Sequence, residues 1–359
     1  MARVFNFGAG PAVLPLEVLE EAQRQLVDFQ GSGISILEHS HRGKEYDAVH
    51  QEAVANLKSL LKLSDDYAVL FLQGGASAQF AIVPMNLLGA GQTADYIHTG
   101  SWAKKAISEA KIIGKVNVAA DTSAEKPARI PRESELRLTP GAAYVHLTSN
   151  ETIDGTQWKS FPRTAAPLVG DMSSDFLSRP FDVNQFALIY AGAQKNVGPA
   201  GTAVVVMRKD LAARVPATVP KFFRYATHIE ENSLYNTPSC FTIYVIMLVT
   251  RWLQKTGQET IYKRNAAKAA KIYDAIDRSG GFYKGTAASD CRSDMNVTFR
   301  LPSEALEESF VKEASKAAMK GLKGHRSVGG IRASIYNAFP PEGVDALVSF
   351  MDDFRRRNG

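Results

Sequence analysis

The chain has 359 residues, of which 45% are hydrophobic and 22% charged, and its formal net charge is +5. This is the composition of a globular protein of about two domains. Acidic and basic residues are interspersed without a basic block, which argues against nucleic-acid binding. The longest apolar run, 241–249, stops before Arg251, so it predicts a buried helix and no membrane span. Two cysteines without metal-ligand spacing, and no signal-peptide pattern in 1–15, predict a cytoplasmic protein without a metal site.

Segments of helical period alternate with short β-branched or aromatic runs. Helices are predicted at 16–30, 47–61, 78–88 and 102–114, and strands at 67–72, 93–98, 143–148, 167–170, 186–190 and 202–207. This alternation predicts an α/β fold with a mostly parallel sheet wrapped by helices. Further elements are predicted at 259–278 (a helix that joins two domains), 296–300 (a strand), 303–320 and 345–357 (helices).

Ligands of such folds bind beyond the carboxyl ends of the strands. Gly74-Gly75-Ala76-Ser77 follows the first strand and enters a helix, where free backbone N–H groups suit an anion. A plain turn with Ser77 as the helix cap is the alternative. Trp102, after the next strand, could lie against a flat ring or fill the core.

Two charged residues occupy the ends of later strands. Lys195 lies among glycines and small residues after strand 186–190. A lysine that is partly desolvated there would have a lowered pKa and could attack an aldehyde, although a surface lysine in a glycine turn would have the same pattern. Asp171 follows strand 167–170 and could bind a cationic nitrogen or cap the next segment.

Cations gather in two loops that are far apart in the sequence. One contains His41-Arg42, and the other contains His325-Arg326 and leads to Arg332. Arginines in glycine-rich loops suit carboxylate or phosphate groups, and a solvated surface patch is the alternative.

Thr237 precedes Pro238, a pair typical of a helix start. Capping is the favoured role of Thr237, and anion binding at the helix N-terminus is the other.

Ordered motifs run through nearly the whole chain. They include 5–11, Ser40-His41-Arg42, Gly74-Gly75, Gly100-Ser101-Trp102, 150–155, 171–174, Gln194-Lys195-Asn196, Asn236-Thr237-Pro238, Gly324-His325-Arg326 and 332–337. In this order they resemble the phosphoserine aminotransferase family, pyridoxal 5′-phosphate enzymes of fold type I. The resemblance implies a large cofactor-binding domain, 16–264, with a mostly parallel seven-stranded sheet, and a smaller α/β domain made of 1–15 and 265–359.

The resemblance also implies a role for each motif. Lys195 would link to the cofactor aldehyde and later move the substrate proton, Asp171 would keep the pyridine nitrogen protonated, and Trp102 would stack on the ring. The cofactor would further be held by Ala76, Ser77, Thr152 and Gln194 and, from the other subunit of a homodimer, by Asn236 and Thr237. Arg332 would bind the substrate α-carboxylate. The substrate phosphate or the distal carboxylate of glutamate would be received by His41, Arg42, His325 and Arg326.

Many relatives carry Gly-Arg where this chain has Ala76-Ser77. Binding of the cofactor phosphate would therefore depend on hydroxyls, backbone N–H groups and the helix dipole.

The implied reaction is reversible ping-pong transamination between glutamate and 3-phosphohydroxypyruvate. A four-carbon phosphorylated oxoacid of vitamin B6 synthesis, 3-hydroxy-2-oxo-4-phosphonooxybutanoate, is a second expected substrate. The alternatives are another fold type I enzyme, such as a different aminotransferase or a cysteine desulfurase using Cys291, and a binding protein without activity.

Overall fold

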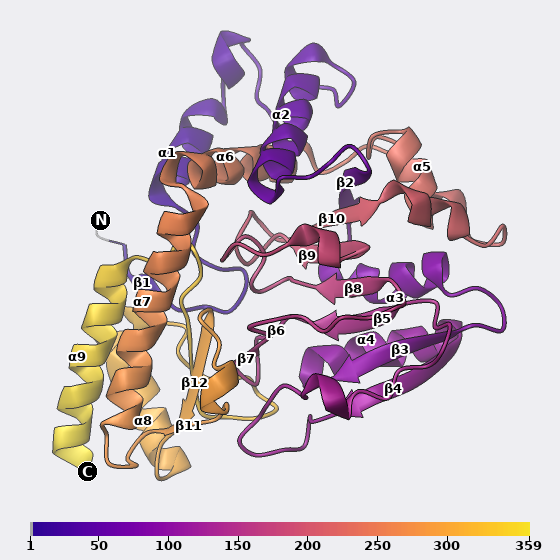
Figure 1. The fold of residues 1–359 in the computed structure, drawn as a ribbon. Coiled ribbons are helices and arrows are strands. Elements are labelled where there is room, and N and C mark those ends of the chain that lie inside the picture. Colours follow the sequence, from indigo (N-terminus) through magenta and orange to yellow (C-terminus); the bar gives the residue numbers. More distant parts are fainter. Residues whose placement is uncertain (1–2) are drawn as a thin grey trace.

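The computed structural model describes residues 3–359 and contains a seven-stranded sheet with the order β2-β10-β9-β8-β5-β3-β4 (Figure 1). The strands are β2 (Tyr67–Gln73), β3 (Thr93–His98), β4 (Lys115–Asp121), β5 (Val145–Thr148), β8 (Leu168–Asp171), β9 (Leu188–Gly192) and β10 (Thr202–Arg208). Only β10 runs antiparallel to its neighbours in this sheet. The α/β fold with a mostly parallel seven-stranded sheet is therefore confirmed.

Helices cover both faces of this sheet because its strands alternate their side chains between two cores. In β2, Val69 and Phe71 join the core formed with α2 (Lys44–Leu61) and α6 (Cys240–Thr256). Leu70 and Leu72 face the other core, with α3 (Gly75–Leu87) and α4 (Ser101–Ile113). The large sheet is thus buried on both sides. Shorter elements of this part are α1 (Leu16–Gln25), β6 (Asn150–Glu151), β7 (Thr156–Gln157) and α5 (Tyr225–Glu230).

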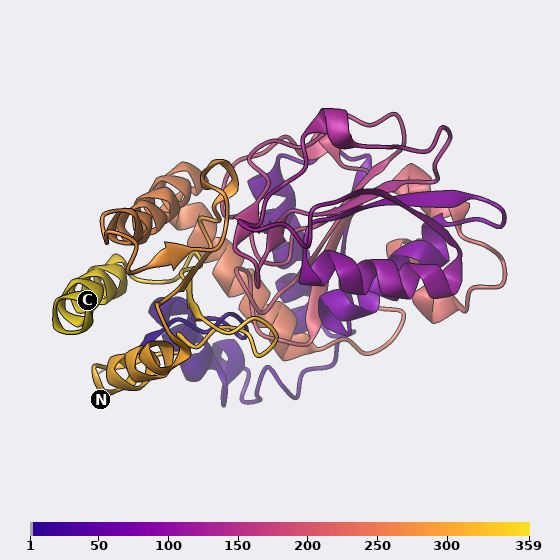
Figure 2. The same cartoon turned by 90° about the horizontal axis from the view of Figure 1, so that it is seen from below.

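A second, smaller body has its own core and lies beside the large sheet (Figure 2). Its elements are α7 (Gln258–Asp277), β11 (Lys284–Gly285), β12 (Asn296–Arg300), α8 (Glu304–Lys316), β13 (Met319–Lys320), β14 (Ile331–Ser334) and α9 (Pro341–Asn358). The N-terminal strand β1 (Phe5–Asn6) pairs with β13, and Phe7 enters the small core. Helix α7 contributes Ile261 to the large core and Ala269 to the small one, so it links the two bodies.

Several predicted elements differ from the structure in their boundaries, and one strand was not predicted. Helix 16–30 ends at Gln25, because Gln30 has a φ of 53° and belongs to a separate 3-10 turn. Helix 303–320 ends at Lys316, where the chain turns into β13. Strand β4 was not predicted, and it is an edge strand in which only Ala119 is buried. Thr237 is not a helix cap, since α6 begins at Cys240 with Ser239 at the capping position.

Along residues 3–359, no helix is long and apolar enough to cross a bilayer. The same part of the chain contains no cluster of His, Cys, Asp and Glu that could hold a metal ion.

Candidate active site

A cavity of about 310 Å³ opens at the carboxyl edge of the large sheet. Strands β2, β5, β8 and β9 all end there, so the segments that follow them converge. Seven of the predicted site residues line this cavity, namely Ala76, Ser77, Trp102, Thr152, Asp171, Gln194 and Lys195. These residues were predicted to be functional because they follow strands. The fold brings them into one cavity although they are up to 119 positions apart in the sequence.

The turn from β2 into α3 forms the anion-binding end of the cavity. Gly74 and Gly75 have φ angles of 89° and 59°, a region that favours glycine. A Cβ on Gly74 would also lie 2.6 Å from the Cβ of Ala78, so a larger residue does not fit. The free N–H groups of the first turn of α3 and the Ser77 side chain line one wall, where the helix dipole favours an anion.

Lys195 lies at the cavity floor with 8% of its surface exposed. Its Nζ donates to Thr152 Oγ1 at 3.3 Å and lies 5.9 Å from the ring centroids of both Trp102 and Tyr336. Burial and the charge of Arg332 lower the pKa of Lys195 to about 7, while Asp171 opposes the shift. A large share of this amine is therefore neutral and nucleophilic near neutral pH.

Asp171 is the carboxylate of the cavity and is only 4% exposed. Its Oδ1 accepts hydrogen bonds from the Ser173 backbone N–H at 2.9 Å and from Ser173 Oγ at 2.6 Å. Burial raises the pKa of Asp171 to about 6, and the Ser173 bonds and Lys195 hold it below the value that burial alone would give. The carboxylate is thus ionised at pH 7 and fixed in orientation.

Several buried polar atoms of cavity-lining residues lack a partner within the described range of 3–359: Thr148 Oγ1, Gln194 Oε1 and Trp102 Nε1. Such atoms are costly unless a ligand or water binds them. Together with a low-pKa amine, a buried carboxylate and a glycine turn at a helix start, they fit an aromatic aldehyde with a ring nitrogen and a phosphate. The residues present therefore suit pyridoxal 5′-phosphate.

Cations of the small body adjoin this cavity. Arg332, on β14, donates from Nη1 to the carbonyl oxygen of Thr152 at 3.4 Å, and its Nε has no partner in the described part of the chain. His325 and Arg326 line a neighbouring hollow of about 580 Å³ together with Ser77. Burial lowers the pKa of His325, as do the positive charges of Arg332, Lys105 and Arg326. So many cations around one imidazole favour an anionic ligand.

Four predicted site residues do not reach the cavity of this chain. Asn236 donates to Gln73 Oε1 at 3.0 Å, and the side chain of Thr237 is exposed. His41 and Arg42 lie in the segment between α1 and α2, and neither lines the cavity. The structure of a single chain therefore does not bring these four residues to the cavity.

Prediction from sequence also missed residues that support the site. Tyr336 lies beside Lys195 and donates from its hydroxyl to the Ala9 carbonyl oxygen at 2.8 Å. Asn337 donates from its backbone N–H to Asn196 Oδ1 at 3.0 Å, next to Lys195. Both residues belong to the sequence motif 332–337, which could have indicated that they lie near the site.

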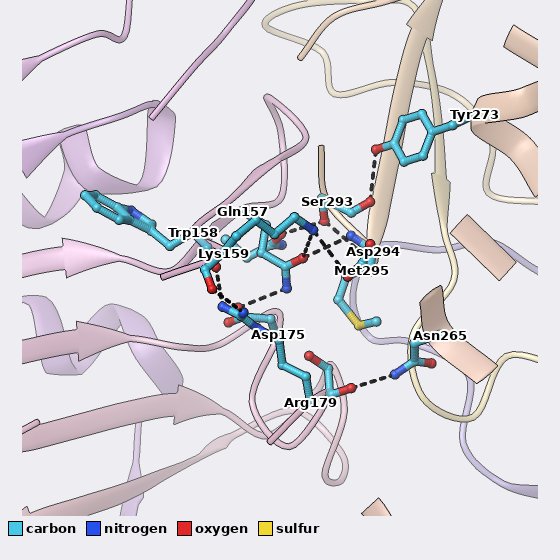
Figure 3. Close-up of polar contacts among 12 residues, drawn as sticks. Gln157, Trp158, Lys159, Asp175, Arg179, Asn265, Tyr273, Ser293, Asp294 and Met295 are labelled. Carbon is cyan, nitrogen blue, oxygen red and sulfur yellow. Dashed lines mark hydrogen bonds and ion pairs between the residues drawn. The ribbon is translucent and has the colours of Figure 1, made fainter. Parts of the chain in front are cut away.

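Behind the site, polar contacts join the small body to loops of the large one (Figure 3). Gln157 donates to buried Asp175 Oδ2 at 3.2 Å and accepts from the backbone N–H of Asp294 at 3.1 Å. Asn265 donates to the Ser178 carbonyl oxygen at 3.0 Å. These bonds fix the wall that carries Arg332 relative to the wall that carries Asp171.

The thiols do not support a desulfurase. Cys291 is buried, and burial raises the pKa of its thiol, whereas an activated thiolate needs a lowered pKa and exposure. Cys240 also has a raised pKa because of burial.

Comparison with known proteins agrees with this chemistry. The model of the aminotransferase class-V family matches residues 4–347. The phosphoserine aminotransferases of Niallia circulans and Desulfosudis oleivorans are 57% and 58% identical, over 99% of each chain. Among solved structures, phosphoserine aminotransferase from Bacillus circulans subsp. alkalophilus has a TM-score of 0.97 at 57% identity, covering 99% of both chains. The pyridoxal-phosphate-bound phosphoserine aminotransferase from Trichomonas vaginalis has a TM-score of 0.94 at 39% identity, covering 98% of this chain and 100% of that one.

Proposed function

Because this chain belongs to the class-V aminotransferase family and is a pyridoxal-phosphate-dependent transaminase, we propose that it transfers the amino group of L-glutamate to 3-phosphohydroxypyruvate. The products are 2-oxoglutarate and O-phospho-L-serine, and the reaction is reversible and ping-pong. The observation that carries the substrate assignment is the group of His325, Arg326 and Arg332 beside the cavity of Lys195. The two relatives compared above are phosphoserine aminotransferases, which supports the same substrate class.

When bound, pyridoxal 5′-phosphate supplies an aldehyde that takes up the amino group and a ring that withdraws electrons from the substrate Cα. Lys195 is the residue that would hold the aldehyde covalently, because a large share of its amine is neutral near pH 7. With the cofactor and substrate bound, Lys195 Nζ would be the base that takes the proton from the substrate Cα and returns it. The hydroxyl of Thr152, 3.3 Å from Nζ, orients this amine.

Asp171 keeps the ring nitrogen protonated. An ionised carboxylate beside a pyridine nitrogen favours its charged form, and that charge increases electron withdrawal. The two bonds from Ser173 go to Asp171 Oδ1, which would leave Oδ2 for the ring nitrogen. Trp102 covers the ring face, and the first turn of α3 holds the phosphate with Ala76 and Ser77. Gln194, whose Oε1 lacks a partner among residues 3–359, is a further cofactor contact.

Arg332 binds the α-carboxylate of the substrate, since a guanidinium matches a carboxylate with two parallel hydrogen bonds. His325 and Arg326 receive either the phosphate of the oxoacid or the distal carboxylate of glutamate, which lets one site accept both substrates in turn. The hollow of about 580 Å³ next to them leaves room for the four-carbon phosphorylated oxoacid as a second substrate.

We further propose a cytoplasmic homodimer in which Asn236, Thr237, His41 and Arg42 serve the cavity of the other subunit. None of the four lines the cavity of its own chain, which supports this arrangement. Mixing Lys195→Ala with Arg42→Ala subunits tests it, because a hybrid dimer has one site with both residues intact. Random mixing makes about half of the dimers hybrids, and each hybrid has one intact site of two, so activity should recover to about a quarter of wild type. If each chain works alone, activity should not recover.

We also propose that the two bodies are domains, with 16–264 as the large cofactor-binding domain and 1–15 and 265–359 as the small one. The separate hydrophobic cores support this division, and the boundary falls within α7.

A glutamate-dependent assay with 3-phosphohydroxypyruvate against unphosphorylated hydroxypyruvate tests the substrate. We expect kcat/KM to be at least about a hundred-fold higher for the phosphorylated acid, because a charged hydrogen-bonded pair contributes roughly 1.5–3 kcal/mol and two cations are available. Equal kcat/KM for the two acids would refute the proposed role of the phosphate.

A further inference from the structure

Glu151 is fully buried, with 0% of its surface exposed, and has no part in the mechanism above. Its carboxylate lies at the N-terminus of α4. Oε2 accepts from the backbone N–H of Trp102 at 3.0 Å, and Oε1 accepts from the N–H of Ala103 at 3.0 Å and from Thr99 Oγ1 at 3.4 Å. Both oxygens therefore act as acceptors for groups at one helix end.

A second carboxylate and a glycine complete this contact. Asp154 Oδ2 accepts from the Ser101 N–H at 3.3 Å. A Cβ on Gly100 would lie 2.5 Å from Asp154 Oδ2 and 2.7 Å from Glu151 Cδ, so the two acids fit only against a glycine. The first three N–H groups of α4, on Ser101, Trp102 and Ala103, thus all bind side-chain carboxylates.

Burying two acids next to each other is costly, which argues for a specific role. Burial and the charge of Asp154 raise the pKa of Glu151 to about 8, and the N–H groups of Ala103 and Trp102 oppose the rise. An uncharged cap such as Ser or Asn would satisfy a helix end at lower cost.

The position of Glu151 connects two walls of the cofactor cavity. Its chain neighbours Asn150 and Thr152 both line the cavity, and Thr152 accepts from Lys195 Nζ. Glu151 also binds the backbone N–H of Trp102. The ring centroid of this indole lies 5.9 Å from Lys195 Nζ, and its Nε1 lacks a partner in the described chain. We propose that Glu151 is a positioning residue that fixes the indole of Trp102 over the cofactor ring. This proposal rests on the proposed role of Trp102 in stacking on that ring.

The test measures cofactor binding by the apoenzyme and the visible circular dichroism of the bound cofactor. In Glu151→Gln the amide presents an NH₂ group to one of the two N–H donors. We expect the cofactor dissociation constant to rise between about ten-fold and a hundred-fold, as leaving a buried N–H donor without an acceptor predicts. The dichroism should fall because the ring loses its fixed aromatic neighbour. Lys111→Gln, at an exposed position of the same helix that lines neither cavity, is the control and should change neither quantity.

A double-mutant cycle distinguishes positioning from general stabilisation. If Glu151 acts through the indole, Glu151→Gln adds less than about two-fold to the dissociation constant in a Trp102→Ala background. An equal loss in both backgrounds, or unchanged binding and dichroism in Glu151→Gln, would overturn the proposal.

If Glu151→Gln does not fold, Asp154→Asn is measured instead. This variant should raise the cofactor dissociation constant by about two- to three-fold, and the increase should disappear in a Trp102→Ala background. An increase that persists in that background would overturn the proposal. The substrate preference is measured separately, so an error in the proposed substrate would leave these binding constants unchanged.

Discussion

The lowered pKa of Lys195 makes a quantitative prediction about the apoenzyme. Burial and Arg332 move this pKa from 10.5 to about 7. At pH 7.5 a group with a pKa of about 7 is roughly three-quarters neutral, whereas an ordinary lysine is neutral in about one molecule in a thousand. The reactive fraction of Lys195 should therefore exceed that of an ordinary lysine by several hundred-fold.

Competitive acetylation measures this difference directly. Apoenzyme is labelled with trace acetic anhydride from pH 5.5 to pH 10, and peptides are quantified by mass spectrometry, with exposed Lys263 as the internal reference. Labelling of Lys195 should rise with pH because the neutral amine reacts, with a midpoint near 7, and then level off. Labelling that keeps rising through pH 10, as for an ordinary amine, would refute the reasoning.

Variants test the causes of the shift. Arg332→Met removes a positive charge that lowers the pKa of Lys195, so its midpoint should move up. Asp171→Asn removes a negative charge that raises it, so its midpoint should move down. Movement of either midpoint in the opposite direction would mean that these charges do not act on Lys195 as the geometry indicates.

Three other changes have defined outcomes. Asp171→Asn should keep the cofactor bound but lower kcat by at least about a hundred-fold, since the ring nitrogen loses its carboxylate; unchanged steady-state kcat would contradict this role. Arg326→Ala should raise the KM for the phosphorylated oxoacid about ten-fold or more and leave hydroxypyruvate nearly unaffected; equal effects would assign Arg326 to structure only. Gly155→Ala should destabilise the fold by about 2 kcal/mol and lower Tm by a few degrees. The reason is that φ is 77° there and a Cβ would collide with Thr298 Oγ1; an unchanged Tm in thermal unfolding would show that the neighbouring strand yields freely.

Much of the cofactor cavity could be predicted because strand ends in a parallel sheet meet at one edge. Asp171 and Lys195 follow the neighbouring strands β8 and β9, and the Gly74 turn follows β2. The pattern of apolar runs located these strands, and the residue types after them suggested the chemistry. The seven-stranded order itself depends on long-range pairing, which a local pattern does not contain.

Other features depend on contacts that no local pattern records. Thr237 resembles a helix cap, but the helix starts three residues later, because side-chain packing of α6 overrides the local start signal. Glu151 reads as part of a polar turn, and only the folded chain brings it to the start of α4. The roles proposed for Asn236 and Arg42 would require a second subunit, whose position the periodicity of one chain does not encode.

The attachment of the cofactor to one amine is the central claim, and borohydride reduction followed by peptide mapping tests it most directly. Holoenzyme is reduced, digested and analysed by mass spectrometry. We predict that the reduced cofactor is found on the peptide that contains Lys195, and that Lys195→Ala yields no labelled peptide. A cofactor mass on another lysine, such as buried Lys268, or a labelled peptide from Lys195→Ala, would contradict the assignment.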